Sequence, residues 1–219
     1  MDDRLRIVPL GGLGEVGKNM MSIEYGEDIL IVDVGMMFPT TGMLGIDYIL
    51  PDWEYLRDKK ERVRAAIITH GHMDHIGALS HFLEEFNVPL YATRLTRGLI
   101  EVQLGQRDML KHATLHTMSP RDEFDIGPFT IEPYHVCHSI PDTVGLGITT
   151  PEGLIVHSGD FKFDHTPVDG WPTDYAKLAE FTGRGVLVLL SDSTNADTPG
   201  RTASEAALYD AFHHIMREA

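Results

Sequence analysis

The stretch AIITHGHMDHIGAL, residues 66–79, places three histidines and one aspartate within six consecutive positions directly after an apolar run. The apolar run predicts a strand and the residues after Gly77 predict a helix, so the polar side chains lie on a strand-to-helix loop. Such a loop can bring together side chains that a regular helix or strand holds apart. Imidazole and carboxylate ligands suit zinc, or manganese as a second choice, and four so close together can serve two ions. The cluster therefore predicts a metal site formed by His70, His72, Asp74 and His75.

The rest of the composition is that of a globular protein. The 219-residue chain is 42% hydrophobic, which is enough for a core. It contains no apolar run of the roughly 18–20 residues that a membrane span needs, and its first residues, MDDRLRIVPL, do not resemble a secretory signal. The single cysteine, Cys137, excludes an internal disulfide framework and fits a reducing compartment. We therefore expect a soluble, cytoplasmic protein.

The charge balance is strongly acidic. Eighteen Lys and Arg residues against 33 Asp and Glu residues give a formal net charge of −15. This argues against a general nucleic-acid-binding surface, which needs a basic face. Carboxylates that bind metal count as negative here although a bound cation neutralises them, so the total overstates the repulsion at a metal site. A polyanionic substrate must be attracted locally.

Short apolar runs that end in turns alternate with segments of helical spacing. A hairpin turn is predicted at residues 26–28, and helices are predicted at residues 77–86 and 203–219, the second with Thr202 and Glu205 as a capping box. The pattern predicts one strand-rich α/β domain with both hairpins and crossovers. The predicted strands lie in LRIVPL, MSIEYGEDILIVDVG, AAIITH, VPLYAT, FTIEPYHV, VGLGITTPEGLIVHSGD and GVLVLLSDS.

The segment LGGLGEVGKN, residues 10–19, contains the spacing of a dinucleotide-binding fingerprint and of a near P-loop, with Asn19 where Ser or Thr should stand. Both motifs need a helix directly after the loop, because the helix N-terminus binds the phosphates. The residues that follow have the pattern of a hairpin. We therefore interpret the segment as a tight glycine turn, one that can still border an active site.

Several other histidines and the cysteine are less informative. His112 and His116 have the spacing of two ligands on one helix, but the segment around His116 reads as extended and no acidic partner stands at metalloprotease spacing. Cys137 lies between His135 and His138, yet neighbours on a regular strand point to opposite faces, which favours a buried structural cysteine. The same interpretation, core or surface, applies to His81, His157, His165, His213 and His214.

Two candidates downstream extend the metal cluster. His138 in VCHSIPD and Asp160 in VHSGDFKFD each follow an apolar run, and strand ends at one sheet edge are where active sites of α/β proteins gather. With these two, THGHMDHIGAL resembles the HxHxDH signature of the metallo-β-lactamase superfamily. PLGGLGEVGKNM, HSIPD, SGDFKFD and DSTNA together resemble the ribonuclease J family of the β-CASP branch, over a span from Leu5 to Glu218.

The resemblance implies an α/β fold of the αββα sandwich type and a centre of two zinc ions, with manganese as the alternative metal. It implies that His70, His72 and His138 hold the first ion, that Asp74 and His75 hold the second, and that Asp160 bridges both. The two ions would activate water and stabilise charge on the phosphoryl group, and Asp74 would orient the attacking water. Asp33 is a candidate for supporting a ligand histidine. The candidates for phosphate contact, for which ordinary turn chemistry is an equal alternative, are Ser139, Ser193, Thr194 and Asn195.

The resemblance also sets the expected function and domain organisation. We expect a ribonuclease that cuts RNA internally and degrades it from its 5′ end, in messenger decay and ribosomal RNA maturation, and that forms dimers or tetramers. Residues 1–219 are expected to be the N-terminal part of a metallo-β-lactamase domain, ending near an absent β-CASP insertion, with a further histidine ligand beyond it. Two alternatives stay open. One is a hydrolase of a small ester, thioester or lactam, and the other is an inactive fragment or assembly module.

Overall fold

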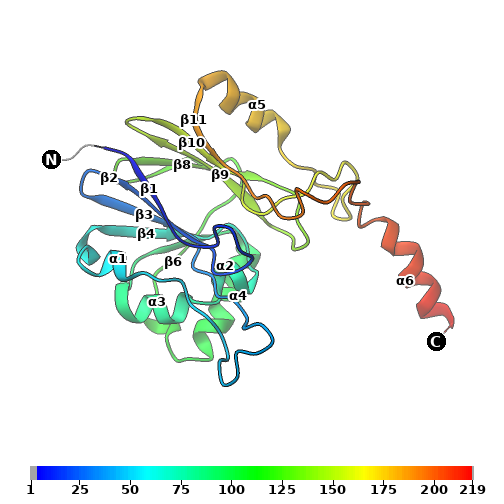
Figure 1. Ribbon diagram of the computed structural model, residues 1–219. Coiled ribbons are helices and arrows are strands. Elements are labelled where there is room, and N and C mark those ends of the chain that lie inside the picture. Colours follow the sequence, from blue (N-terminus) through cyan, green and yellow to red (C-terminus); the bar gives the residue numbers. More distant parts are fainter. Residues whose placement is uncertain (1–3, 219) are drawn as a thin grey trace.

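A computed structural model describes residues 4–218 of the chain, which form two β-sheets with helices on their outer faces (Figure 1). The first sheet has six strands in the order β1-β2-β3-β4-β5-β6. The first three pair antiparallel, and β3 to β6 pair in parallel. Their bounds are β1 Arg6–Gly11, β2 Met20–Tyr25, β3 Asp28–Val32, β4 Val63–Ile67, β5 Leu90–Ala92 and β6 Leu115–Thr117.

The second sheet has five strands in the order β11-β10-β9-β8-β7. Its pairs are antiparallel except that β10 and β11 run in parallel. Strands β7 to β10 are neighbours in the sheet in chain order, so they form a meander, and a crossover connection leads to the parallel strand β11. The strands are β7 Phe124–Ile126, β8 Phe129–His135, β9 Val144–Thr150, β10 Gly153–His157 and β11 Val186–Leu190.

Three apolar clusters hold four layers together. Ile23, Leu30 and Ile67 of the first sheet pack against Phe129 and Leu146 of the second, and this forms the core between the sheets. A second cluster joins the outer face of the first sheet to helices α3 (Leu79–Phe86) and α4 (Arg94–Gly105). A third places Phe181 of helix α5 (Tyr175–Arg184) on the outer face of the second sheet. The order helix, sheet, sheet, helix confirms the predicted αββα sandwich.

The helices lie on different sides of the two sheets. Helices α1, α3 and α4 lie on the side of the first sheet, α5 lies on the opposite side of the molecule, and α6 extends away from both (Figure 1). Within residues 4–218, no helix is both long enough and apolar enough to cross a membrane. The helices are α1 Glu54–Arg57, α2 Met73–Ile76, α3 Leu79–Phe86, α4 Arg94–Gly105, α5 Tyr175–Arg184 and α6 Ala207–Glu218, with short 3-10 turns at Lys60–Arg62 and Leu110–His112.

A buried ion pair attaches helix α5 to the second sheet. The carboxylate of Glu132, whose residue is 2% exposed on β8, accepts hydrogen bonds from Lys177 Nζ at 2.8 Å and from Arg184 Nη1 at 2.6 Å. Burial alone raises the pKa of Glu132, but the hydrogen bonds and charges of the two cations outweigh it and lower that pKa. The helix is therefore bound to the sheet by charge as well as by Phe181.

The predicted hairpin between β2 and β3 is confirmed, with Tyr25 paired to Asp28 across the turn. The glycine segment joins two antiparallel strands, β1 and β2, so no helix follows it and neither nucleotide motif has the context it needs. The predicted capping box is wrong. Helix α6 begins at Ala207, and the backbone N–H of Ala206 bonds the Ser204 hydroxyl instead.

Candidate metal centre

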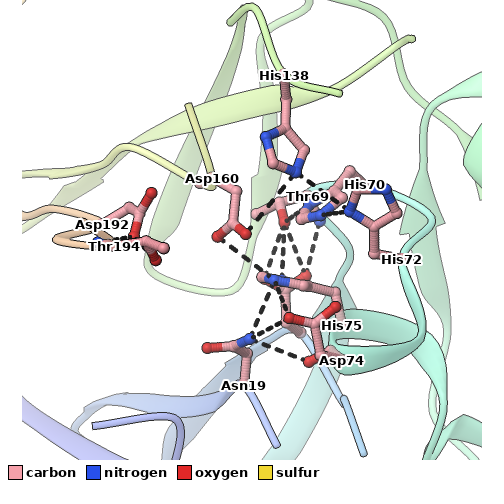
Figure 2. Close-up of polar contacts among 12 residues, drawn as sticks. Asn19, Thr69, His70, His72, Asp74, His75, His138, Asp160, Asp192 and Thr194 are labelled. Carbon is pink, nitrogen blue, oxygen red and sulfur yellow. Dashed lines mark hydrogen bonds and ion pairs between the residues drawn. The ribbon is translucent and has the colours of Figure 1, made fainter. Parts of the chain in front are cut away.

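The predicted ligands meet at one end of the sandwich, just beyond the carboxyl ends of four strands. Asp33 directly follows β3, His70 lies three residues after β4, His138 three after β8, and Asp160 three after β10. The first two strands belong to one sheet and the last two to the other. The site therefore lies across the line where the two sheets meet, and both sheets contribute side chains to it (Figure 2).

One group of donor atoms consists of three imidazoles. His72 Nδ1 lies 3.0 Å from His70 Nε2 and 3.1 Å from His138 Nε2. The three ligand atoms all lie within 4.8 Å of one another, with His70 buried and the other two partly buried. Three convergent ring nitrogens at this spacing match the ligand chemistry of a tetrahedral zinc site with an open position.

A second group surrounds Asp160. His70, His75 and Asp160 also place one ligand atom each within 4.8 Å of one another. His75 Nε2 lies 3.4 Å from Asp160 Oδ1 and 3.6 Å from Asp74 Oδ2, while Asp160 Oδ2 lies 3.8 Å from His138 Nε2. One oxygen of Asp160 thus faces each group, which is the arrangement that a bridging carboxylate needs. The structure brings together all six residues that the sequence proposed as ligands.

The backbone around the cluster is fixed by an unusually close approach. The segment after β3 lies directly against helix α2, where the N–H of Val34 donates to the carbonyl of His75 at 2.9 Å and the N–H of Met36 to that of Met73 at 3.0 Å. A Cβ on Gly35 would lie 1.5 Å from the carbonyl oxygen of Asp74, so only glycine fits there. This contact positions Asp74 and His75 relative to β3.

Behind the ligands, Asp33 accepts hydrogen bonds in a buried network. Asp33 is 2% exposed and adopts a left-handed backbone conformation with φ of 59°. Its carboxylate accepts from His75 Nδ1 at 2.8 Å, from the Thr69 N–H at 2.8 Å and from Thr69 Oγ1 at 2.9 Å. Thr69 Oγ1 also lies 3.1 Å from His70 Nδ1. Each contact fixes the ring nitrogen that points away from the cluster, so His70 and His75 present Nε2 to it.

Burial and neighbouring charges set the protonation of these groups. Burial, reinforced by the charge of His75, lowers the pKa of His70 to about 2, and burial also lowers the pKa of His138. For His75, burial lowers the pKa, but Asp33 and Asp160 outweigh it and raise the pKa to about 10. His75 in turn holds the pKa of Asp160 well below its usual range, against the opposing effect of burial. His70, His138 and Asp160 are therefore in the neutral and ionised forms that bind metal, whereas His75 has to release a proton when a metal binds.

A cleft of about 830 Å³ opens on the side of Asp74, His75 and Asp160. Its walls are the glycine segment and the residues after β11, which include the predicted phosphate contacts Ser193, Thr194 and Asn195. All three are exposed, and the Thr194 hydroxyl bonds Asp192 Oδ1 at 2.7 Å, so Thr194 also has a turn-forming role. Ser139 lies elsewhere, in a second cavity beside His138.

Sequence reasoning missed two residues that contact the ligands, Thr69 and Asn19. Thr69 stands directly before His70, and a hydroxyl next to a ligand cluster is the signal that could have indicated it. Asn19 belongs to the glycine segment, yet its amide lies 3.0 Å from His75 Nε2 and 3.3 Å from Asp74 Oδ2. His157, interpreted as a core or surface residue, lines the cleft.

His112, His116 and Cys137, which sequence reasoning set aside, are not members of the cluster. His112 is in a 3-10 turn and His116 is on β6 stacked against Tyr91, so the two do not share a helix face. Cys137 is buried, and its Sγ faces the carbonyl oxygens of Asp164 and Trp171, at 3.8 and 3.5 Å. Its interpretation as a structural cysteine is confirmed by this environment.

The sandwich and the histidine and aspartate cluster define a class, and the chain belongs to the metallo-β-lactamase superfamily, whose family profile matches residues 13–204. Over 98% of its length the chain is 45% identical to ribonuclease J of Synechocystis sp. strain PCC 6803 and 44% identical to ribonuclease J of Helicobacter pylori strain 26695. It covers 34% and 31% of those proteins, so it spans about a third of the length of the curated relatives it matches. The resemblance to the ribonuclease J family is thus confirmed.

A solved structure supports the fold independently of these sequences. The chain matches a protein of unknown function from Enterococcus faecalis V583 with a TM-score of 0.67. The match covers 92% of this chain and 53% of that one, at 18% sequence identity. At this identity the likeness concerns the fold alone.

Proposed function

We propose that this chain carries the metal centre of a zinc-dependent ribonuclease of the ribonuclease J type, which hydrolyses RNA phosphodiester bonds. The observation that carries the proposal is the meeting of two ligand groups at Asp160, in a chain 45% identical to a ribonuclease J. We further propose that cleavage is both internal and 5′-to-3′ exonucleolytic, and that it serves RNA processing and decay in the cytoplasm.

In this proposal His70, His72 and His138 would hold one ion, Asp74 and His75 would hold a second, and Asp160 would serve both. The nitrogen-rich first group favours Zn²⁺, and Mn²⁺ is the alternative because the second group includes two carboxylates. Two divalent ions at such a centre supply Lewis acidity that lowers the pKa of water and offsets charge on the phosphoryl oxygens and the leaving group.

The chain's own residues prepare the site for a phosphodiester. Asp74, whose side chain is 31% exposed, faces the cleft and can accept a hydrogen bond from the attacking water. Ser193 and Asn195 supply hydroxyl and amide donors to the cleft, and such donors bind phosphate oxygens without adding charge. The Thr194 hydroxyl donates to Asp192 Oδ1 in this structure, so it has to leave that carboxylate before it can donate to a phosphate. Ser139 beside His138 offers a further hydroxyl from the second cavity. Donors of this kind would bind a polyanionic substrate locally, although the net charge of the chain is acidic.

Because the relatives are about three times as long, we propose that residues 1–219 correspond to the N-terminal portion of their metallo-β-lactamase domain, before the β-CASP insertion. Assembly of the protein into dimers or tetramers is likewise a proposal that follows from the family resemblance.

The test compares substrates on the same preparation. The chain, loaded with Zn²⁺ or Mn²⁺, is incubated with 5′-monophosphorylated RNA and, separately, with a small thioester, and Asp160→Asn serves as the inactive control. We expect RNA cleavage that requires metal and Asp160. Turnover of the thioester alone would overturn the assignment to RNA. Fewer than one zinc per folded chain, with no cleavage, would favour an assembly module instead.

A further inference from the structure

Asn19 lies at the exit of the glycine segment and touches the second ligand group from outside it. Its Nδ2 lies 3.1 Å from the carbonyl oxygen of Asp74, 3.3 Å from Asp74 Oδ2 and 3.0 Å from His75 Nε2. Figure 2 shows the amide below these two side chains, on a segment separate from the other ligands. The contacts join residues 55 and 56 positions apart in the chain.

The orientation of the amide is fixed by its surroundings. A backbone carbonyl only accepts hydrogen bonds, so the atom that faces the Asp74 carbonyl must be the NH₂ nitrogen. The Asn19 backbone is held as well, because its N–H donates to the same carbonyl at 3.0 Å and its carbonyl accepts from the Gly35 N–H at 2.9 Å. On the other side stands Gly12, with φ of +82°, where a Cβ would lie 2.4 Å from Asn19 Oδ1.

We propose that Asn19 is a positioning residue for the second half of the metal centre, the half formed by Asp74, His75 and Asp160. This inference rests on the metal centre proposed above. The NH₂ group has two hydrogens and faces three atoms, the carbonyl oxygen and Oδ2 of Asp74 and Nε2 of His75. If His75 Nε2 is used for a metal, the two hydrogens match the carbonyl and the Oδ2 of Asp74 one to one, and they hold that carboxylate in place.

The chemistry of the amide suits this role. A neutral NH₂ donor orients a carboxylate without competing with the metal cation for it, as a cationic lysine or arginine would, and the nitrogen adds no ligand of its own. Among the described residues, Asn19 has no recorded contact with His70, His72 or His138, so its influence falls on one half of the centre only. The role also explains the glycine segment, because Gly12 leaves the space that the amide occupies.

The experiment separates the two halves by mutation. His72→Ala removes a nitrogen of the three-histidine group, and Asp74→Ala removes a carboxylate of the other, so each variant reports on the half that stays intact. Asn19→Leu, close to asparagine in shape but without donors, is added to each, and Co²⁺ affinity is measured by calorimetry and by visible absorption. We expect Asn19→Leu to weaken Co²⁺ binding about 10–100-fold in the His72→Ala chain and less than about two-fold in the Asp74→Ala chain.

Two further variants test whether the effect comes from the position of the Asn19 amide. Gly12→Ala touches no ligand but pushes the amide aside, so it should weaken Co²⁺ binding in the His72→Ala chain in the same direction. Glu15→Gln lies in the same segment, where Glu15 pairs with Lys18 at 3.0 Å, and should leave the affinity unchanged. Circular dichroism and thermal unfolding check that each variant is folded.

The inference is overturned if Asn19→Leu keeps the parental affinity, since shape alone would then suffice, or if it weakens both backgrounds equally, since the effect would then be a general loss of structure. RNA cleavage does not enter this test. Co²⁺ binding without RNA cleavage would therefore count against the nuclease and leave the role of Asn19 standing. An unsubstituted chain that binds no Co²⁺ would remove the metal centre and this inference together.

Discussion

Replacing Asp33 by alanine is expected to destabilise the metal-free protein strongly, although Asp33 is not itself among the proposed ligands. Its carboxylate is buried and accepts hydrogen bonds from the Thr69 N–H, the Thr69 hydroxyl and His75 Nδ1. The hydroxyl has a second partner, since His70 Nδ1 lies 3.1 Å away. The other two donors are left buried without an acceptor when the carboxylate is removed.

The magnitude follows from those two donors. An orphaned buried donor costs about 1–3 kcal/mol, so Asp33→Ala should lower the free energy of unfolding by about 2–6 kcal/mol. That is a large part of the roughly 5–15 kcal/mol of a typical domain. Asp33→Asn should cost less, about 1–3 kcal/mol, because its amide oxygen still serves Thr69 while its NH₂ faces His75 Nδ1 without matching it.

The assay is urea unfolding at pH 7 with a chelator present, followed by circular dichroism and by fluorescence. Asp125→Ala is the matched control, because Asp125 is exposed and accepts one hydrogen bond, from Thr130 Oγ1 at 2.6 Å. Its effect should stay within about 0.5 kcal/mol. If the free energy of unfolding of Asp33→Ala lies within about 1 kcal/mol of that of the parent, the hydrogen bonds to Asp33 do not stabilise the protein and the reasoning is refuted.

Three further outcomes are expected. Asp160→Asn should abolish RNA cleavage and release at least one metal per chain by elemental analysis, because a neutral amide cannot replace a bridging carboxylate; unchanged stoichiometry and rate would rule out bridging. His112→Ala should change the rate by no more than a few-fold, and a large loss would show that His112 belongs to a functional site. Lys177 and Arg184 hold the pKa of Glu132 below 4.5, so their stabilisation is complete above pH 4.5 and is lost as the pH falls through the lowered value. The free energy of unfolding of Glu132→Gln should depend less steeply on pH in that window than that of the parent. An identical pH profile would contradict the stabilising role of the ion pair.

The sequence predicted the parts of the site that are local or that follow strands. His70, His72, Asp74 and His75 lie within six positions, so their spacing alone indicated that they are close together. The predicted shared loop is wrong for two of them, because Asp74 and His75 lie in the short helix α2. Asp33, His138 and Asp160 could be found because each follows an apolar run, and the ends of neighbouring strands lie close in space. The sandwich itself followed from the family resemblance, since strand order depends on pairings between distant segments.

The remaining parts depend on contacts that leave no local pattern. Asn19 reaches His75 across 56 residues of sequence, and the glycines before it resemble a nucleotide loop until the strand after them is seen to pair antiparallel. Thr202 and Glu205 had the spacing of a capping box, but the chain stays non-helical until Ala207. There Ser204 bonds the Ala206 N–H and the Thr166 carbonyl instead, and a tertiary contact of this kind cannot be read from spacing.

The position of the ligands across both sheets has a mechanical consequence. His70, His72 and His75 follow a strand of the first sheet, and His138 and Asp160 follow strands of the second. Near the site, hydrogen bonds join the two halves, from the Val144 N–H to the Thr69 carbonyl at 3.0 Å and from the Thr93 hydroxyl to the Asp142 carbonyl at 2.7 Å. A metal held by ligands from both sheets would bind only the folded protein. At a free concentration one hundred times its dissociation constant it would raise the free energy of unfolding by about 2.7 kcal/mol. By the same linkage, replacing Phe129 or Leu146 in the core between the sheets with alanine should lower the observed metal affinity to the extent that the variant populates forms in which the two sheets have separated.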